Sequence, residues 1–199
     1  MTNERAHSGR YSIKLTGVAD SLTGDPNSPR GAGVFRAQPF PEEAYYSAWY
    51  FLPIPYEPST SWTILSFKSM DDPGEPTSLI DLRLRSLPDG GLTLSLFDHR
   101  AQYLESPLPA LPPEVPIGSW FQIETLYRNV ADSTGRIAIW LNGIAVYDER
   151  RPMTGIPWVY FSPCNTVNAM VPSSAVLYID DVAVSTTPVT TSGVLTAFP

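Results

Sequence analysis

Cysteine is almost absent from this chain of 199 residues, which contains only Cys164. A single cysteine excludes a disulfide framework within the chain. Because no histidine-rich motif surrounds Cys164, we interpret it as a small, half-buried apolar residue and not as a nucleophile. Long apolar runs are missing too, so no segment is predicted to cross a membrane as a helix. The first five residues, MTNER, do not read as a signal peptide, and the compartment stays open at this point.

Basic residues are scarce. The chain has 13 Lys and Arg against 20 Asp and Glu, for a formal net charge of −7 at pH 7. Non-specific binding to DNA or RNA requires a basic surface that neutralises phosphates, so this composition argues against a nucleic-acid partner. An acidic polymer can still bind where the few Arg and Lys side chains gather on one face. Hydrophobic residues make up 43% of the chain, which is enough for a globular core.

Helical apolar spacing is missing as well, and the only candidate is one turn near residues 41–43. Short β-prone runs follow one another instead, separated by Pro and Gly turns. We expect strands over residues 11–16, 33–37, 44–52, 62–69, 78–85, 92–97, 120–128, 136–142, 158–161 and 174–185. This series predicts an all-β protein, an antiparallel β-sandwich of the jelly-roll type, with residues 1–185 as a single domain. The Thr-, Pro- and Ser-rich residues 186–199 are predicted to be a tail or linker.

The region 118–147, GSWFQIETLYRNVADSTGRIAIWLNGIAVY, contains two amphipathic strands and the start of a third. Side chains two positions apart in a strand point to the same face, so each strand buries an apolar row and presents a mixed polar and indole row. DSTG at 132–135 is a turn signal between the first two strands. Asn142-Gly143 predicts a two-residue hairpin of type I′.

Eight polar or aromatic side chains lie on rows opposite the aliphatic ones, and we predict that they line one concave sheet. They are Trp49, Lys68, Arg83, Arg85, Gln122, Glu124, Arg128 and Trp140. Aromatic rings stack on the apolar faces of sugars, while amide, carboxylate and guanidinium groups hydrogen-bond hydroxyl and acidic groups. The group therefore predicts binding of a polar or anionic polysaccharide. The alternative is a solvated sheet face, with Trp49 and Trp140 partly buried in the core.

Three short motifs occur in order: HSGRYSIKL at 7–15, GSW at 118–120 followed by IWLNG at 139–143, and YIDDV at 178–182. Together they resemble the concanavalin A-like lectin/glucanase superfamily, which includes laminin-G-like modules, carbohydrate-binding modules and jelly-roll polysaccharide lyases. The strand regions 46–53 and 62–68 are most similar to the branch of heparin-lyase-like enzymes. The resemblance covers about residues 6–185. It implies two curved sheets, a glycan on the concave face, and an extracellular or cell-surface protein.

The resemblance also bears on catalysis. The glucanase branch carries its carboxylates for glycoside hydrolysis on one strand, and no such run occurs here, because the adjacent Asp180 and Asp181 face opposite ways. A lyase needs a base, an acid, and cations that neutralise a uronate carboxylate. The Pro-rich connection 98–116 offers His99 as base and Tyr103 as acid.

Arg83, Arg85 and Arg128 are the candidates for neutralising the uronate carboxylate. The lyase branch usually has an Arg-x-Glu strand after its first loop, whereas this chain has GVFRA at 33–37 without the Glu. That departure favours a noncatalytic glycan-binding module, for instance in a larger protein. A polysaccharide lyase acting on a uronate polymer is the second hypothesis, and a structural or adhesive sandwich that binds no sugar is the third.

Asp180 and Asp181 lie in the last predicted strand, where several carbohydrate-binding modules have a calcium ligand. With Asp25 and loop carbonyls they predict an oxygen-lined Ca²⁺ site. The alternative is that the two carboxylates accept backbone N–H bonds at the end of a strand. We predict that His7, in the turn before the first strand, is structural.

Overall fold

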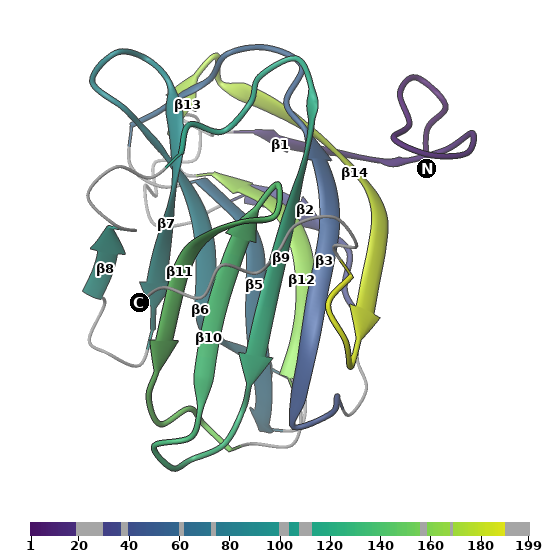
Figure 1. Cartoon of the computed structure of the whole chain (residues 1–199). Coiled ribbons are helices and arrows are strands. Elements are labelled where there is room, and N and C mark those ends of the chain that lie inside the picture. The colour runs from purple at the N-terminus through teal and green to yellow at the C-terminus, as the bar shows by residue number, and fades with distance from the viewer. Residues whose placement is uncertain are drawn as a thin grey trace.

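Two six-stranded antiparallel sheets pack face to face in the computed structural model of the chain (Figure 1). The structure describes residues 1–18, 30–36, 40–59, 62–72, 75–99, 104–107, 113–155, 159–167 and 169–189. We call the sheet nearer the viewer in Figure 1 the front sheet and the other one the back sheet. This architecture confirms the predicted all-β sandwich.

Each sheet combines strands from distant parts of the chain. In spatial order, the front sheet consists of β1 (Ile13–Val18), β14 (Ser174–Ser185), β3 (Glu43–Phe51), β9 (Trp120–Arg128), β10 (Arg136–Leu141) and β11 (Ile144–Arg150). The back sheet consists of β2 (Arg30–Gly33), β12 (Val159–Val167), β5 (Trp62–Asp72), β6 (Glu75–Ser86), β7 (Leu92–Asp98) and β8 (Leu104–Pro107). A small third sheet pairs β4 (Glu57–Pro58) with β13 (Met170–Val171).

Alternating burial explains why these segments are strands. In β3, Ala44, Tyr46, Ala48 and Tyr50 are buried in the core between the sheets, and the residues between them lie on the outer row. The predicted hairpin is also present, because Asn142 and Gly143 have φ values of 51° and 77°, as a type I′ turn requires.

Three local predictions differ from the structure. β2 ends at Gly33, where a strand was predicted to begin. Residues 98–116 were predicted to be a plain connection, but β8 lies within them and pairs with β7. Its sequence, LESP, is too short and polar to reveal a strand, and the pairing with β7 makes it one. Glu43 begins β3, and the described residues contain no helical turn near it.

The core joins the two sheets through large aromatic side chains. Phe67 of β5 and Tyr127 of β9 stack with ring centroids 4.7 Å apart and an interplanar angle of 8°.

Cys164 is buried, and burial raises the pKa of its thiol to about 12. A thiol in this state is not a nucleophile at neutral pH, in agreement with the interpretation from the sequence. No membrane-spanning helix occurs in the described part of the chain.

One buried amide fastens the sheets to each other. Asn165 of β12 is fully buried, and its Oδ1 accepts a hydrogen bond of 2.8 Å from the indole Nε1 of Trp62 in the same sheet. Its Nδ2 donates to the carbonyl oxygens of Leu15 and Ala175, at 3.0 and 2.9 Å, both in the front sheet. Both amide hydrogens and one acceptor position of the oxygen are therefore used between strands.

Candidate functional site

The predicted binding residues do not lie on one face. Trp49, Gln122, Glu124, Arg128 and Trp140 belong to the front sheet, on strands β3, β9 and β10. Lys68, Arg83 and Arg85 belong to the back sheet, on β5 and β6. Each group lies on the row opposite the core, so the two groups are on opposite outer surfaces of the sandwich. The prediction of a single lined face is wrong, because the eight residues are divided between two surfaces.

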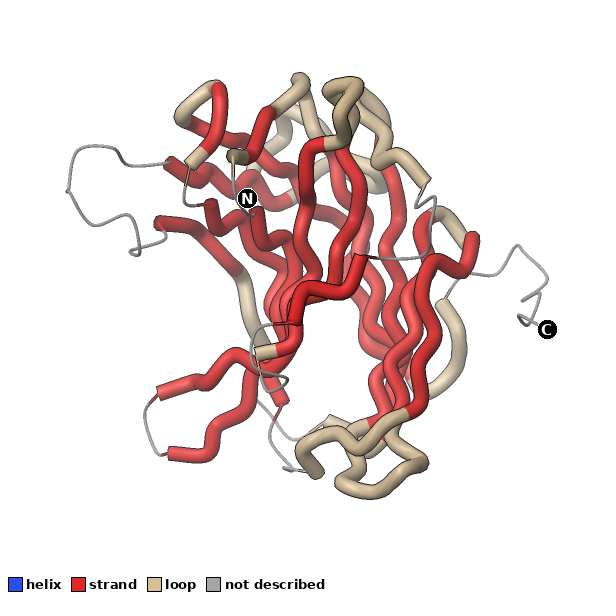
Figure 2. Tube along the Cα trace, turned by 90° about the vertical axis from the view of Figure 1, so that its left-hand side faces the viewer, coloured by secondary structure: helices blue, strands red, loops and turns tan. Residues whose placement is uncertain are grey.

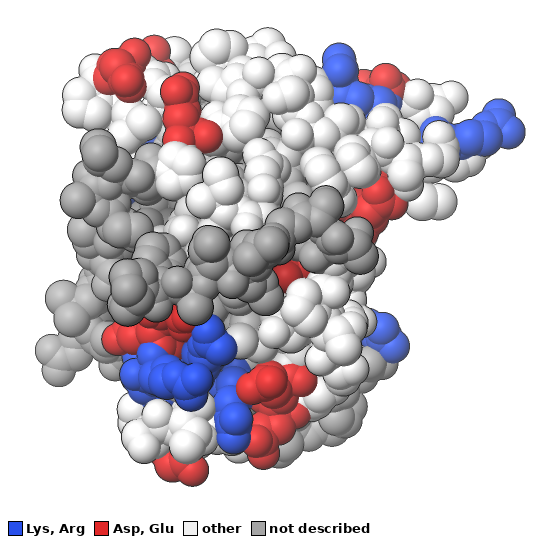
Figure 3. Space-filling model, in the orientation of Figure 1, with Lys and Arg blue, Asp and Glu red and all other residues white. Residues whose placement is uncertain are grey.

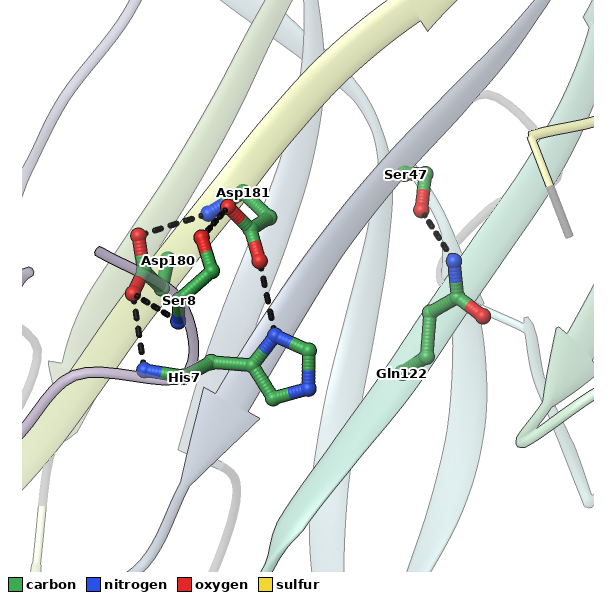
Figure 4. A network of polar contacts seen from close by, with 6 residues as sticks. All are labelled: His7, Ser8, Ser47, Gln122, Asp180 and Asp181. Carbon is green, nitrogen blue, oxygen red and sulfur yellow. Dashed lines mark hydrogen bonds and ion pairs between the residues drawn. The ribbon is translucent and has the colours of Figure 1, made fainter.

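On the front sheet, the N-terminal segment covers the first predicted binding residue. The imidazole of His7 stacks on the indole of Trp49 with ring centroids 3.8 Å apart and an interplanar angle of 14°. Its Nδ1 is 2.7 Å from a carboxylate oxygen of Asp181 (Figure 4). His7 thus occupies the face of Trp49 on which a sugar would stack. As predicted, His7 has a structural role, because it joins the N-terminal segment to Trp49 and Asp181.

Neighbouring front-sheet residues are also engaged within the chain. The side-chain amide of Gln122 donates to the hydroxyl of Ser47 at 2.9 Å, and both residues are buried. Glu124 accepts a hydrogen bond of 2.9 Å from the backbone N–H of Val189, at the start of the C-terminal segment. Trp140 is only 7% exposed and packs in a small apolar cluster on this outer face. These contacts leave the predicted aromatic row of the front sheet covered.

The carboxylates of Asp180 and Asp181 hold the same N-terminal segment (Figure 4). The backbone N–H groups of His7 and Ser8 donate to one oxygen of Asp180, at 2.8 and 3.2 Å, and the N–H of Asp181 donates to the other at 2.8 Å. The hydroxyl of Ser8 donates to Asp181 at 2.5 Å. Burial by itself raises the pKa of Asp181, but the bonds from His7 and Ser8 outweigh it and lower this pKa.

The predicted calcium site does not fit these contacts. Each of the four carboxylate oxygens of Asp180 and Asp181 already faces an N–H, an O–H or the His7 ring, as Figure 4 shows. A cation would have to displace or compete with these groups, which already hold the N-terminal segment on the two carboxylates. Asp25 lies outside the described residues, and among those that are described no group of three His, Cys, Asp or Glu could hold a metal ion.

The outer face of the back sheet is different. Figure 2 shows this sheet on the left, with both ends of its strands leaning away from the front sheet, so that its outer face is concave. Side chains of three adjacent strands meet on this face around one buried carboxylate, which belongs to Asp81 of β6. We call the group of Ser66, Asp81, Arg83, Phe97 and His99 the Asp81 cluster.

Three donors surround the carboxylate of Asp81. The hydroxyl of Ser66 donates to one oxygen at 2.6 Å. The other oxygen is 2.8 Å from Nε2 of His99 and 3.1 Å from a terminal nitrogen of Arg83. The Arg83 guanidinium also lies 3.6 Å from the ring centroid of Phe97, and the Phe97 and His99 rings are nearly perpendicular with centroids 4.8 Å apart. The carboxylate therefore orients one guanidinium and one imidazole on the concave face.

Further groups lie beside the Asp81 cluster. Lys68 is half-buried and follows Ser66 by two positions, so it points to the same side of β5. The residue paired with it on β12 is Tyr160. Arg85 is exposed two positions beyond Arg83. Tyr103, the predicted acid, lies outside the described residues. Of the residues predicted from the sequence, the structure thus brings Arg83 and His99 together at Asp81, and Lys68 and Arg85 lie to either side of them on the same face.

Comparisons with known proteins bear on the fold. No protein-family model matches the chain, and no match was found among curated protein sequences. Among solved structures, endo-β-1,4-glucuronan lyase from the fungus Trichoderma reesei is similar with a TM-score of 0.71 and 16% identity, over 93% of this chain and 85% of the other. The cellulose induced protein Cip1 is similar with a TM-score of 0.59 and 16% identity, over 93% and 84%. The alginate lyase Aly36B is similar with a TM-score of 0.57 and 13% identity, over 89% and 82%.

This chain is a jelly-roll β-sandwich. The fold implied by the sequence motifs is therefore confirmed. At these identities the likeness is one of fold, and a shared fold does not define function, which depends on the side chains of the site.

Sequence reasoning missed three members of the Asp81 cluster in this jelly roll, namely Ser66, Asp81 and Phe97. A signal was present, because Asp81 is on the same row of β6 as Arg83 and Arg85. A carboxylate two positions from an arginine on one strand face indicates an oriented ion pair. That Ser66 and His99 join it depends on the pairing of β6 with β5 and β7, which the sequence alone does not define.

The charge of Asp81 is expected to stabilise the jelly roll above acidic pH. Burial raises the pKa of Asp81, but the bonds from His99 and Ser66 and the charge of Arg83 outweigh it, so the pKa lies below its ordinary value of 3.8. A lowered folded-state pKa contributes stability that is present above the unfolded-state pKa and is lost as pH falls through the folded-state pKa. We expect Asp81→Asn to lower the free energy of unfolding by about 2–3 kcal/mol at pH 7, because the amide cannot satisfy all three donors.

The check is urea unfolding of the parent and of Asp81→Asn between pH 7 and pH 3. The difference in free energy of unfolding between the two proteins should narrow as the pH approaches and passes below 3.8. Asp89→Asn is the matched control, because Asp89 is exposed in the β6–β7 turn, and its effect should stay within about 0.5 kcal/mol. A gap that is independent of pH would contradict the role assigned to the Asp81 charge.

Proposed function

We propose that this jelly roll binds a uronate-containing polysaccharide on the concave outer face of the back sheet. The observation that supports this most directly is the Asp81 cluster, with Lys68 beside it. Two permanent cations, an imidazole and an aromatic ring lie there on neighbouring strands. A uronate polymer offers the complementary groups, namely a carboxylate on each acidic sugar and apolar ring faces between them.

The geometry suits a carboxylate better than a neutral hydroxyl. Asp81 takes one terminal nitrogen of Arg83, and the Nε of Arg83 is buried without a hydrogen-bond partner among the described residues. Asp81 therefore engages only part of the guanidinium, and a guanidinium binds a carboxylate through a fork of charge-assisted hydrogen bonds that a neutral hydroxyl cannot accept in the same way. Lys68 adds a second, more mobile charge. In a chain of net charge −7, such a local positive region is needed before a polyanion can approach.

The glucuronan and alginate lyases among the similar structures are named for uronate polymers, which supports the same ligand class for this chain. The proposal also implies a location outside the cell, because long polysaccharides do not cross membranes and the protein would meet an extracellular polymer there. The aromatic row of the front sheet takes no part in it, since Trp49 and Trp140 are covered by other parts of the chain.

The first test is calorimetric titration with oligomers of glucuronate and of alginate, with a neutral β-1,4-glucan oligomer as the reference ligand. We expect saturable binding of one or both acidic oligomers that weakens with added salt, and no binding of the neutral one. Arg83→Lys should reduce the affinity about tenfold, because lysine keeps the charge but loses the planar stack on Phe97 and the fork of donors. Equal binding of acidic and neutral oligomers would overturn the proposal.

Eliminative cleavage of the polymer is a second candidate function. It is favoured by the hydrogen bond that fixes the His99 ring on Asp81, beside Arg83. In this reaction a base removes the proton from the carbon beside the carboxylate, and the electron pair forms a carbon–carbon double bond. The bond to the leaving oxygen breaks, and an acid protonates that oxygen. Arg83 would neutralise the carboxylate as its charge develops.

The same incubations separate the two candidates. Cleavage creates an unsaturated sugar that absorbs in the ultraviolet, so its absorbance should rise with time if the protein is a lyase. A stable complex with no rise in absorbance supports binding alone. If no acidic glycan binds and none is cleaved, a structural or adhesive role is left.

A further inference from the structure

The second outer surface carries three arginines side by side. Arg128 of β9 is paired with Arg136 of β10, and Arg136 is paired in turn with Arg150 of β11. Paired residues of neighbouring strands project from the same face, so we call these three side chains the arginine row. They lie on the outer face of the front sheet, where Figure 3 shows basic side chains gathered at its lower end beside acidic ones.

The contacts between the three arginines do not themselves stabilise the fold, although Glu43 is paired with Arg128 across β3 and β9. Like charges directly opposite each other on adjacent strands destabilise a sheet. Only Arg136 has a well-formed partner, because its Nε and one terminal nitrogen bind the two oxygens of Asp148 at 2.8 and 2.5 Å. The remaining two arginines are held much more loosely.

Carboxylates of the described residues engage Arg128 and Arg150 only weakly. The nearest carboxylates to Arg128 belong to Glu43 and Glu42, at 3.6 and 3.7 Å, beyond hydrogen-bonding distance, and its Nε is buried without a partner among the described residues. Arg150 is exposed and forms no ion pair within the described part of the chain. Adjacent strands are separated by about 4.8 Å, so the outer two guanidinium stems start roughly 10 Å apart.

We infer that the arginine row is a second anion-binding site, which takes the carboxylate or sulfate groups of an acidic polysaccharide running across β9, β10 and β11. Guanidinium groups bind both kinds of anion in a forked geometry. Glu42 and Glu43 are exposed and compete weakly, since solvent screens their charges. The site is independent of the Asp81 cluster, which lies on the opposite side of the sandwich.

Two anion sites on opposite faces would let one protein molecule bind two polymer chains, whereas one site would not. A protein that holds a polymer on each face links polymer chains to one another. This part of the inference rests on the proposed function of the back sheet, whereas the arginine row itself does not. With a long polyanion, linking produces turbidity that is greatest at an intermediate ratio of protein to polymer.

The experiment measures stoichiometry and turbidity separately. Short oligomers of glucuronate and of dextran sulfate are titrated into the parent, into Arg128→Gln/Arg150→Gln, and into Lys68→Glu. We expect two sites per parent molecule for at least one ligand, and one site in each variant. Long polyglucuronate or dextran sulfate should make the parent turbid and leave the double arginine variant clear. The two polymers distinguish carboxylate from sulfate as the preferred group.

Controls keep the outcomes separate. Arg10→Gln removes an exposed arginine outside the row and should change neither stoichiometry nor turbidity. Thermal unfolding verifies that each variant is folded. The arginine row is supported if Lys68→Glu still binds one equivalent of oligomer and the double arginine variant binds one equivalent less than the parent. This criterion also holds if the back sheet of the parent binds no oligomer. Equal stoichiometry in the parent and the double arginine variant would overturn the inference.

Discussion

Replacing Asn165 by alanine is expected to destabilise the sandwich by about 3–5 kcal/mol. The change removes three buried hydrogen bonds, to Trp62, Leu15 and Ala175, and leaves their donor and acceptors without partners. Each unsatisfied buried group costs about 1–3 kcal/mol, although the three costs are not independent. The effect is large because Asn165 is fully buried.

The measurement is equilibrium unfolding in urea, with the slope checked for a change in compactness. Asn3→Ala is the matched control, because Asn3 is exposed, and it should alter the free energy of unfolding by less than about 0.5 kcal/mol. A loss below about 1 kcal/mol for Asn165→Ala would mean that the amide does not fasten the sheets. Such a result would also weaken the placement of β5, which carries Ser66 and Lys68.

Alternation along each strand made the fold predictable from the sequence. The period of two is local, so Ile80, Leu82 and Leu84 identify the buried face of β6 without any knowledge of its neighbours. The hairpin at Asn142 was predictable for the same reason, because its two residues must adopt positive φ. Local rules therefore gave the class of fold and most strand positions.

Which strands share a sheet was not predictable in this way. Trp49 and Lys68 are each on a polar row, but β3 joins the front sheet and β5 joins the back sheet. The strand order is set by long-range pairing, and alternation carries no information about it. The eight binding residues were assigned correctly to the polar rows of their strands. The prediction that they line one face failed because these strands belong to two different sheets.

Contacts between distant segments were equally hidden. His7 reaches Asp181 across 174 positions of sequence, and Val189 reaches Glu124 across 65. These contacts cover front-sheet residues that were predicted from the sequence to bind sugar. The Asp81 cluster was partly accessible to sequence reasoning, because Arg83 and His99 were both proposed as members of an acidic-glycan site.

Reversing the charge at Lys68 is expected to lower the affinity for a uronate oligomer at the back sheet about 100-fold. The substitution Lys68→Glu removes a charge-assisted hydrogen bond to the ligand and adds repulsion, together worth about 3 kcal/mol. Lys68 is half-buried beside the Asp81 cluster and belongs to none of its hydrogen bonds, so the fold should tolerate the change. Titration of folded protein with acidic oligomers gives the affinity.

The chain supplies its own matched control, since Lys14 is its only other lysine. Lys14 lies on β1 in the front sheet and binds Glu4 at 2.7 Å near the surface. Lys14→Glu makes the same change in net charge on the opposite side of the sandwich, so it reproduces any effect of overall repulsion but leaves the back-sheet site intact. Affinity should then fall far more in Lys68→Glu than in Lys14→Glu. Equal losses in the two variants would show that net charge, and not the concave face of the back sheet, governs binding.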